Sequence, residues 1–254
     1  MWLFIAIAII AALAYAAEQL APRQVAGLLP DSWSKQAGAQ IEKRFAERGD
    51  ICETLAGRVA LSRLASRLGS SSGSGAIPDV RIDVYRIPVL NAFTLPGRHI
   101  LQLSQVIDDA ETPAEVAGVL AHELGHVAHR DAEAQYVREL GLQVLAGAFA
   151  GGTGSGGLAL SMASITTLLS YSRAAESEAD SFALAALHKA EIDPAGLKRF
   201  FERIQDGERQ SPSAALDQVL GAFVTHPGTA ERIQAIVPLA PGAVTRPALD
   251  AADW

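Results

Sequence analysis

The sequence predicts a mainly helical α+β fold with a small antiparallel sheet beside a central helix. Apolar residues recur at helical spacing among charged ones over residues 18–68 and again after residue 112. Apolar and polar residues alternate over residues 81–87, and Pro96 and Gly97 separate two further apolar runs, as in a hairpin. Of the 254 residues, 49% are hydrophobic, which is enough for one sizeable core.

The chain begins with an uncharged apolar segment, residues 1–17. It is slightly shorter than the about 20 apolar residues that a membrane-spanning helix needs. Small residues at Ala14 and Ala16 would suit signal-peptide cleavage, but no Lys or Arg precedes the segment. We therefore expect a single N-terminal membrane anchor with the remaining chain outside the cytoplasm. Secretion to the periplasm after cleavage of a signal peptide is the alternative.

The rest of the chain divides by composition into four parts. Residues 18–68 are predicted to form a helical region, and the Gly/Ser-rich residues 69–78 a flexible linker. A single domain is expected over residues 79–240, followed by an irregular tail, residues 241–254. Within the domain, the uncharged glycine-rich stretch 141–169 is either a hairpin that touches lipid or covers a cleft, or a buried helix pair.

Charge and cysteine content exclude some functions. The formal net charge is -7 and no Lys/Arg-rich run occurs, so we expect no nucleic-acid binding. Cys52 is the only cysteine, so an intrachain disulfide cannot form.

The most informative motif is HELGH, residues 122–126. On a helix, His122 and His126 lie one turn apart on one face, where two imidazoles can bind one zinc ion. Glu123 projects beside this pair and can take a proton from an attacking water without binding the metal. The sequence TPAE at 112–115 predicts a capping box, so this helix should begin near Pro113.

The flanking residues are consistent with a helix that packs on a core. Apolar side chains fall on the face opposite to the two histidines: Val116, Leu120, Leu124 and Val127. Gly118 and Gly125 lie near the histidine side, where they would let another backbone approach closely.

A third metal ligand is expected in ESEAD, residues 176–180, because catalytic zinc usually has three protein ligands. Glu176 and Glu178 lie about 200° apart around a helix, so only one of them can face the metal. Asp180 favours Glu176, because it lies one turn further on the same face and can accept the second ring N–H of a zinc-bound histidine. Arg173 is expected to neutralise part of this acidic pair. Alternatively, these residues form only a solvated charged helix face.

Four motifs occur in an order that resembles one known family: NAFTLPG (91–97), HELGHVAHR (122–130), SRAAESEAD (172–180) and THPGTAERI (225–233). Residues 76–237 resemble the membrane-linked gluzincin zinc metallopeptidases, which include HtpX-type proteases, CAAX prenyl endopeptidases and BepA-type proteases. The layout is most similar to a small BepA-like protease without its repeat domain. The resemblance implies a gluzincin-type domain in which Glu176 is the third zinc ligand and Asp180 the accompanying aspartate. It also implies that His226 steadies the reacting carbonyl or closes the open site of the metal.

These observations predict a zinc-dependent endopeptidase that acts on unfolded or membrane-associated proteins in quality control. Glu123 and His226 are the expected catalytic residues, and Asn91, Ala92 and Phe93 are expected to bind substrate as an added strand. Two other functions remain open. The chain could be a zinc-stabilised, chaperone-like binding protein, or a hydrolase of a lipid or small amide.

Overall fold

The computed structural model describes residues 22–71, 77, 79–149, 162–210, 225–226, 229–240 and 242–252. The predicted N-terminal anchor and the centre of the glycine-rich stretch lie outside these residues. Within the described ranges, no helix is both long enough and apolar enough to cross a membrane.

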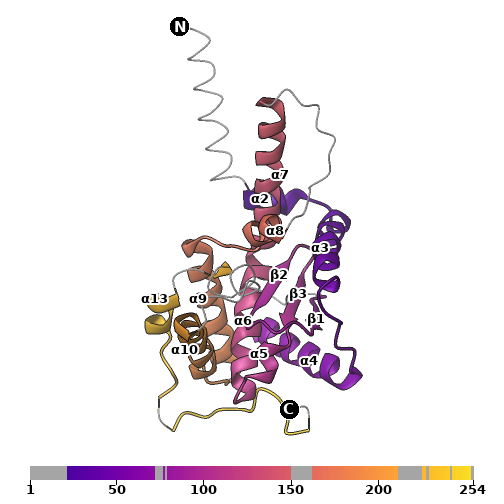
Figure 1. The fold of residues 1–254 in the computed structure, drawn as a ribbon. Helices are drawn as coiled ribbons and strands as arrows, with labels where there is room; N and C mark the ends of the chain where they lie inside the picture. The colour runs from indigo at the N-terminus through magenta and orange to yellow at the C-terminus, as the bar shows by residue number, and fades with distance from the viewer. Residues whose placement is uncertain are drawn as a thin grey trace.

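The predicted fold class, mainly helical with a small sheet, is confirmed (Figure 1). The strands are β1 (Arg81–Tyr85), β2 (Ala92–Leu95) and β3 (His99–Leu103). The first helices in the chain are α2 (Pro22–Leu28), α3 (Asp31–Ala46), α4 (Leu55–Ser71), α5 (Gln105–Asp108) and α6 (Pro113–His129). They are followed by α7 (Asp131–Phe149), α8 (Met162–Leu168), α9 (Arg173–Lys189), α10 (Ala195–Gln210) and α13 (Thr229–Ala235).

The sheet is mixed and not entirely antiparallel, as the sequence had predicted it to be. Strands β2 and β3 form the predicted antiparallel hairpin around Pro96 and Gly97, but β1 pairs with β3 in parallel. The strand order is β1-β3-β2, so the hairpin places its second strand next to β1. Two reversals of the chain leave β3 running in the same direction as β1, and the two strands pair in parallel because β2 does not lie between them, as it would in a simple meander.

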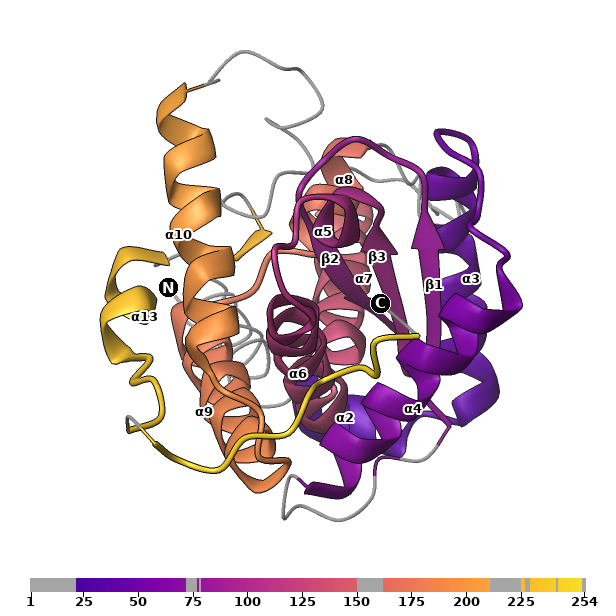
Figure 2. The ribbon, with the colours of Figure 1, turned by 90° about the horizontal axis from the view of Figure 1, so that it is seen from below.

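Helices cover both faces of the sheet, whereas the alternation of apolar and polar residues in β1 suggested only one buried face. Figure 2 shows α6, α9 and α10 on one side of the sheet and α3 on the other. Ile82, Ala92 and Ile100 belong to a core that also contains side chains of α4, α6, α9 and α10. Tyr85 and Phe93 belong to a second core with α3 and α8.

The helical region before residue 69 forms part of this packing. Helix α4 continues to Ser71, into the predicted linker, and its residues Leu61, Leu64 and Leu68 are buried in the first core. Residues 69–78 were expected to link a separate helical region to the domain, but the segments before and after them share one core.

Helix α6 begins at Pro113 as predicted, but the expected capping box does not form. Thr112 has extended backbone angles, but its side chain accepts no hydrogen bond from a backbone amide of the first turn, and its hydroxyl donates to the Glu115 carboxylate (3.4 Å). Glu115 is buried and forms ion pairs with Arg199 and Arg203 of α10 instead. The two guanidinium groups stabilise the buried carboxylate, which the sequence pattern could not reveal.

Glycines let the neighbouring helices approach α6, as the sequence predicted. A Cβ atom on Gly118 would lie 2.7 Å from the Cα of Leu197 in α10. On Gly125 it would lie 2.8 Å from the Cα of Ala179 in α9. Helix α9 is therefore close enough to bring its carboxylates to the histidines of α6.

The substitution Gly125→Ala is expected to destabilise the fold by about 1–3 kcal/mol, because backbone atoms of α9 would have to move. Urea unfolding in the presence of chelator measures this effect without a contribution from metal. Gly141→Ala is the matched control, since a Cβ on this helical glycine would meet nothing within 4 Å. It should stabilise the protein by about 0.5–1 kcal/mol. Equal stability of the two variants would contradict the packing of α6 on α9.

Candidate metal centre

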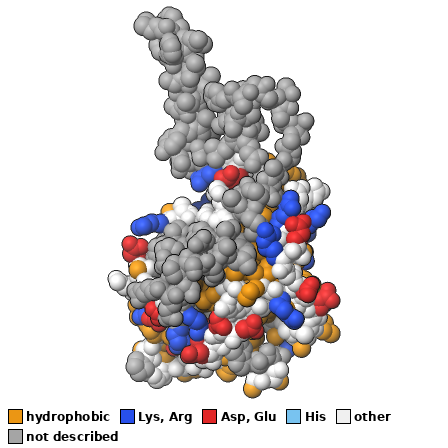
Figure 3. All heavy atoms as spheres, in the orientation of Figure 1, with side chains coloured by type: hydrophobic (Ala, Val, Ile, Leu, Met, Phe, Trp, Pro, Cys, Tyr) orange, Lys and Arg blue, Asp and Glu red, His pale blue; other side chains and the backbone are white. Residues whose placement is uncertain are grey.

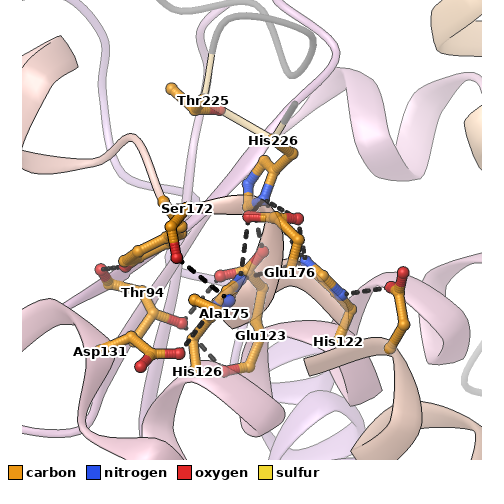
Figure 4. A network of polar contacts seen from close by, with 12 residues as sticks. Thr94, His122, Glu123, His126, Asp131, Ser172, Ala175, Glu176, Thr225 and His226 are labelled. Atoms are coloured by element: carbon orange, nitrogen blue, oxygen red, sulfur yellow. Dashed lines mark hydrogen bonds and ion pairs between the residues drawn. The ribbon is translucent and has the colours of Figure 1, made fainter. Parts of the chain in front are cut away.

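Two helices bring three of the predicted ligands together (Figure 4). The Nε2 atoms of His122 and His126 on α6 lie 3.2 Å apart. The carboxylate of Glu176, in the first turn of α9, lies 3.4 Å from His122 Nε2 and 3.6 Å from His126 Nε2. All three side chains are buried. Ser172 caps α9 by accepting a hydrogen bond from the amide of Ala175 (3.2 Å), which fixes the start of this helix.

The fourth member of the group is His226. Its Nδ1 lies 3.0 Å from Glu176 and 3.4 Å from His122 Nε2. One ligand atom from each of the four residues lies within 4.8 Å of the others, so this cluster could hold a metal ion. Imidazole nitrogens and a carboxylate oxygen are the ligand types that zinc takes in tetrahedral sites, so the residues fit this ion.

The electrostatics of the cluster favour a cation. Burial lowers the pKa of His126, but hydrogen bonds with Asp131 and Glu176 outweigh this and raise the pKa to about 10. Burial raises the pKa of Glu176, but His226, His122 and His126 hold it well below its usual range. The Glu176 carboxylate is thus ionised and stabilises positive charge at the point where the side chains meet.

Glu178 and Arg173 lie away from the cluster. The side chain of Glu178 is 48% exposed and pairs with Arg23 (2.6 Å), which agrees with the predicted orientation of Glu176 alone towards the histidines. Arg173 was expected to neutralise the acidic pair but is 76% exposed and lies near Glu231 (3.7 Å). That expectation was wrong, because Arg173 points to solvent from the start of α9.

Arg232, on α13, occupies the place expected for Arg173 and was missed in the sequence. Its Nε and Nη2 donate to Asp180 (2.7 and 2.8 Å), and its Nη1 lies 2.6 Å from Glu176. The guanidinium also stacks 4.2 Å from the centre of the Phe201 ring. Its only sequence signal was its place in the last motif, THPGTAERI.

His122 and His126 each have a carboxylate beside the second ring nitrogen. Asp180 lies 3.0 Å from His122 Nδ1, at the position that the sequence predicted. Asp131, which the sequence analysis did not identify, lies 2.9 Å from His126 Nδ1. An Nδ1–H donated to a carboxylate leaves the Nε2 lone pair free to bind a metal. Both rings therefore present Nε2 towards Glu176.

Glu123 lies beside the cluster without belonging to it. Its Oε2 accepts a hydrogen bond from the hydroxyl of Thr94 (2.7 Å), and its Oε1 lies 3.7 Å from His226 Nε2. A cavity of about 10 Å³ adjoins Glu123, His122 and His226. This is about the space that one water molecule requires. A glutamate next to such a space can exchange a proton with water.

Strand β2 is an edge of the sheet and approaches the cluster. The amide of Leu103 donates to the carbonyl of Asn91 (3.0 Å), so alternate residues along β2 face β3. Ala92 and Thr94 therefore direct their backbone groups outward. The Ala92 amide donates to Asn91 Oδ1 (2.8 Å), and the Thr94 carbonyl accepts from the Tyr171 hydroxyl (3.0 Å).

The three residues predicted to bind substrate differ in their position relative to the cluster. Asn91 and Ala92 line the small cavity, and Asn91 Nδ2 donates to Thr225 Oγ1 (3.0 Å), next to His226. Phe93 points away, because its ring packs against Phe45 in the second core and its backbone faces Leu101. The structure thus brings two of the three to the cluster.

One protein family and several known proteins match this chain. The profile of peptidase family M48 matches residues 59–240. The chain is 32% identical to the mitochondrial metalloendopeptidase OMA1 of Schizosaccharomyces pombe, over 69% of this chain and 51% of that protein. It is 32% identical to the putative beta-barrel assembly-enhancing protease of Vibrio cholerae, over 57% of this chain and 31% of that protein. It is 30% identical to the metalloprotease LoiP of Escherichia coli, over 69% of this chain and 68% of that protein. The matched part of the chain spans about half the length of the first of these relatives.

Proposed function

Because the chain belongs to peptidase family M48, we propose that it is a zinc-dependent endopeptidase whose metal is held by His122, His126 and Glu176. The resemblance noted in the sequence is thereby confirmed at the level of the family. The observation that carries the proposal is the convergence of these three buried side chains with Glu123 beside them. Two imidazoles and one carboxylate leave a fourth position for the reaction.

A zinc ion, when bound, would polarise the substrate carbonyl and lower the pKa of water at the site. Glu123 takes the proton of the attacking water and passes it to the leaving amine. Thr94 supports this role, because its hydroxyl holds Glu123 Oε2 and leaves Oε1 towards the small cavity. Asp180 and Asp131 keep the two histidine rings in the orientation that presents Nε2.

We assign His226 to the substrate carbonyl. In the structure its Nδ1 lies beside Glu176 and its Nε2 faces Glu123. A hydrogen bond from this ring to the developing negative oxygen would stabilise the transition state by about 3 kcal/mol. The water-sized cavity is too small for a peptide, so substrate entry requires the Thr225–His226 segment or α10 to shift. The same ring would occupy the fourth position in the absence of substrate.

The edge strand β2 could bind an extended protein segment through its outward-facing backbone groups. Among the described residues, the outward carbonyl of Ala92 and the outward amide of Thr94 have no hydrogen-bond partner. They can pair with an added strand, which places its backbone beside Glu123. This mode of binding requires an unfolded or extended chain and favours internal cleavage.

Membrane association is the last part of the proposal. It is supported by the uncharged residues 1–17 and by the relative named as a protease that enhances beta-barrel assembly. We propose that the segment attaches the chain to a membrane and that the protein acts on damaged or unassembled proteins there.

The proposed activity is tested with the full chain in detergent and an unfolded protein such as casein. Internal cleavage is expected, lost after treatment with a zinc chelator and restored by added Zn²⁺. Casein that is bound but stays intact would favour a chaperone-like protein. Hydrolysis of small esters or amides with intact casein would favour the other hydrolase.

A further inference from the structure

We infer that Arg23 is a positioning residue that fixes the metal ligand His126 through Asp131. The inference rests on the proposed metal site. Because Arg23 lies on α2, the metal affinity would depend on the position of this helix, which follows the N-terminal apolar segment in the sequence.

The backbone between α6 and α7 brings Asp131 back towards the ligand. Arg130 ends α6 with a left-handed conformation (φ 56°), and Asp131 is the first residue of α7. This turn places the Asp131 carboxylate beside the ring of His126 (Figure 4). The distance between Asp131 Oδ2 and His126 Nδ1 is 2.9 Å. The carboxylate is buried, so it needs a compensating cation.

Arg23 is that cation and comes from a distant part of the chain. Its Nε and Nη2 both donate to Asp131 Oδ1, at 3.0 and 2.7 Å. The other oxygen, Oδ2, is the one beside His126. With Oδ1 held by two donors, the carboxylate cannot rotate freely, and Oδ2 remains available to accept the His126 Nδ1–H. Arg23 therefore acts on the orientation of a ring that it does not touch.

Helix α2 is held beside both ligand-bearing helices. Nη1 of Arg23 lies 2.6 Å from Glu178 on α9. Arg130, at the end of α6, donates to the carbonyl of Ala26 (3.3 Å). Arg23 thus has two carboxylate partners, of which only Asp131 contacts a proposed metal ligand.

The two proposed metal ligands on α6, His122 and His126, have corresponding supports. His122 is held by Asp180 and Arg232, and His126 by Asp131 and Arg23. They differ in exposure, since the side chain of Arg232 is 8% exposed and that of Arg23 is 41% exposed. Of the two arginines, Arg23 is therefore the one that solvent can contact, and a displacement of α2 would move it away from Asp131.

The experiment measures zinc affinity directly. The full chain is prepared metal-free, and Zn²⁺ binding is followed by competition with a chromogenic chelator at pH 7. Asp131→Ala is expected to weaken binding about 10- to 100-fold, as for other partners of metal-bound histidines. Arg23→Ala should weaken it by about 3- to 10-fold, since it loses the group that holds the carboxylate but not the carboxylate itself. Arg23→Lys should recover part of the loss.

Glu178→Gln is the matched control, because it removes the other ion pair of Arg23 and leaves the Asp131 link in place. Its affinity should equal that of the wild type. Arg23→Ala in an Asp131→Ala background should cause no further loss. Wild-type affinity in Arg23→Ala, or an equal loss in Glu178→Gln, would overturn the inference, and circular dichroism excludes unfolding as the cause. Failure of the wild type to bind zinc would instead contradict the proposed function.

Discussion

Replacing Glu123 with glutamine is expected to lower the rate constant of casein cleavage, kcat, by about 10²- to 10⁴-fold, as is typical when a general base is lost. Glutamine has nearly the same shape and can still accept the hydrogen bond from Thr94. It cannot take a proton from water. Zinc binding should persist, because Glu123 is not among the four clustered donors.

Two measurements make this prediction specific. The zinc content of Glu123→Gln, measured by atomic absorption, should equal that of the wild type. Glu231→Gln is the control, since this glutamate is 73% exposed and lies next to Arg232 in sequence; its activity should be unchanged. A Glu123→Gln protein that keeps a tenth or more of the activity would mean that another group accepts the proton.

The second large effect is expected on stability. Arg232→Ala should lower the free energy of unfolding by about 3–5 kcal/mol, because it leaves Asp180 and Glu176 as buried carboxylates without their cation. Arg173→Ala is the matched control, because this arginine is exposed and its partner Glu231 is too. It should cost less than about 1 kcal/mol. Urea unfolding of both variants, in the presence of chelator, measures the difference.

This stability difference should depend on pH. Burial raises the pKa of Asp180, but Arg232 and His122 outweigh it and lower the pKa to about 2. A carboxylate whose pKa is lowered by folding contributes stability above its unfolded pKa of about 4, and this contribution is lost as the pH falls towards 2. The gap between wild type and Arg232→Ala should therefore narrow from pH 4 to pH 2. A gap that is constant over this range would show that Arg232 stabilises by packing alone.

Local periodicity was sufficient for the parts of the site that lie on one helix. The spacing of His122 and His126 on α6, and the choice of Glu176 over Glu178 on α9, depend only on helical geometry. Gly118 and Gly125 likewise indicated where neighbouring helices approach. These features are visible in sequence because each depends on residues a few positions apart.

Features that depend on distant segments were missed. Arg232 and Arg23 are ordinary basic residues in sequence, and they acquire roles only because α13 and α2 pack beside Asp180 and Asp131. The parallel pairing of β1 with β3 depends on where the hairpin docks, which alternation does not encode. Phe93 was expected to bind substrate as part of an added-strand contact, whereas its backbone pairs with Leu101 of β3 and its side chain lies in the second core.

The distribution of charge on the surface says little about function. On the face in Figure 3, acidic and basic side chains are interspersed with apolar ones. Such a surface is ordinary for a folded protein and does not identify a partner. The specific information lies in the buried charged groups, which are costly unless paired.

His122, His126 and Glu176 are proposed to bind one ion together. A crystal structure with anomalous diffraction collected above and below the zinc absorption edge would show that ion and its ligands. We expect one zinc peak per chain, about 2.0–2.2 Å from a nitrogen of each histidine and from a Glu176 oxygen. Zinc-loaded crystals with no peak among these side chains, or with a peak only at other residues, would contradict the account.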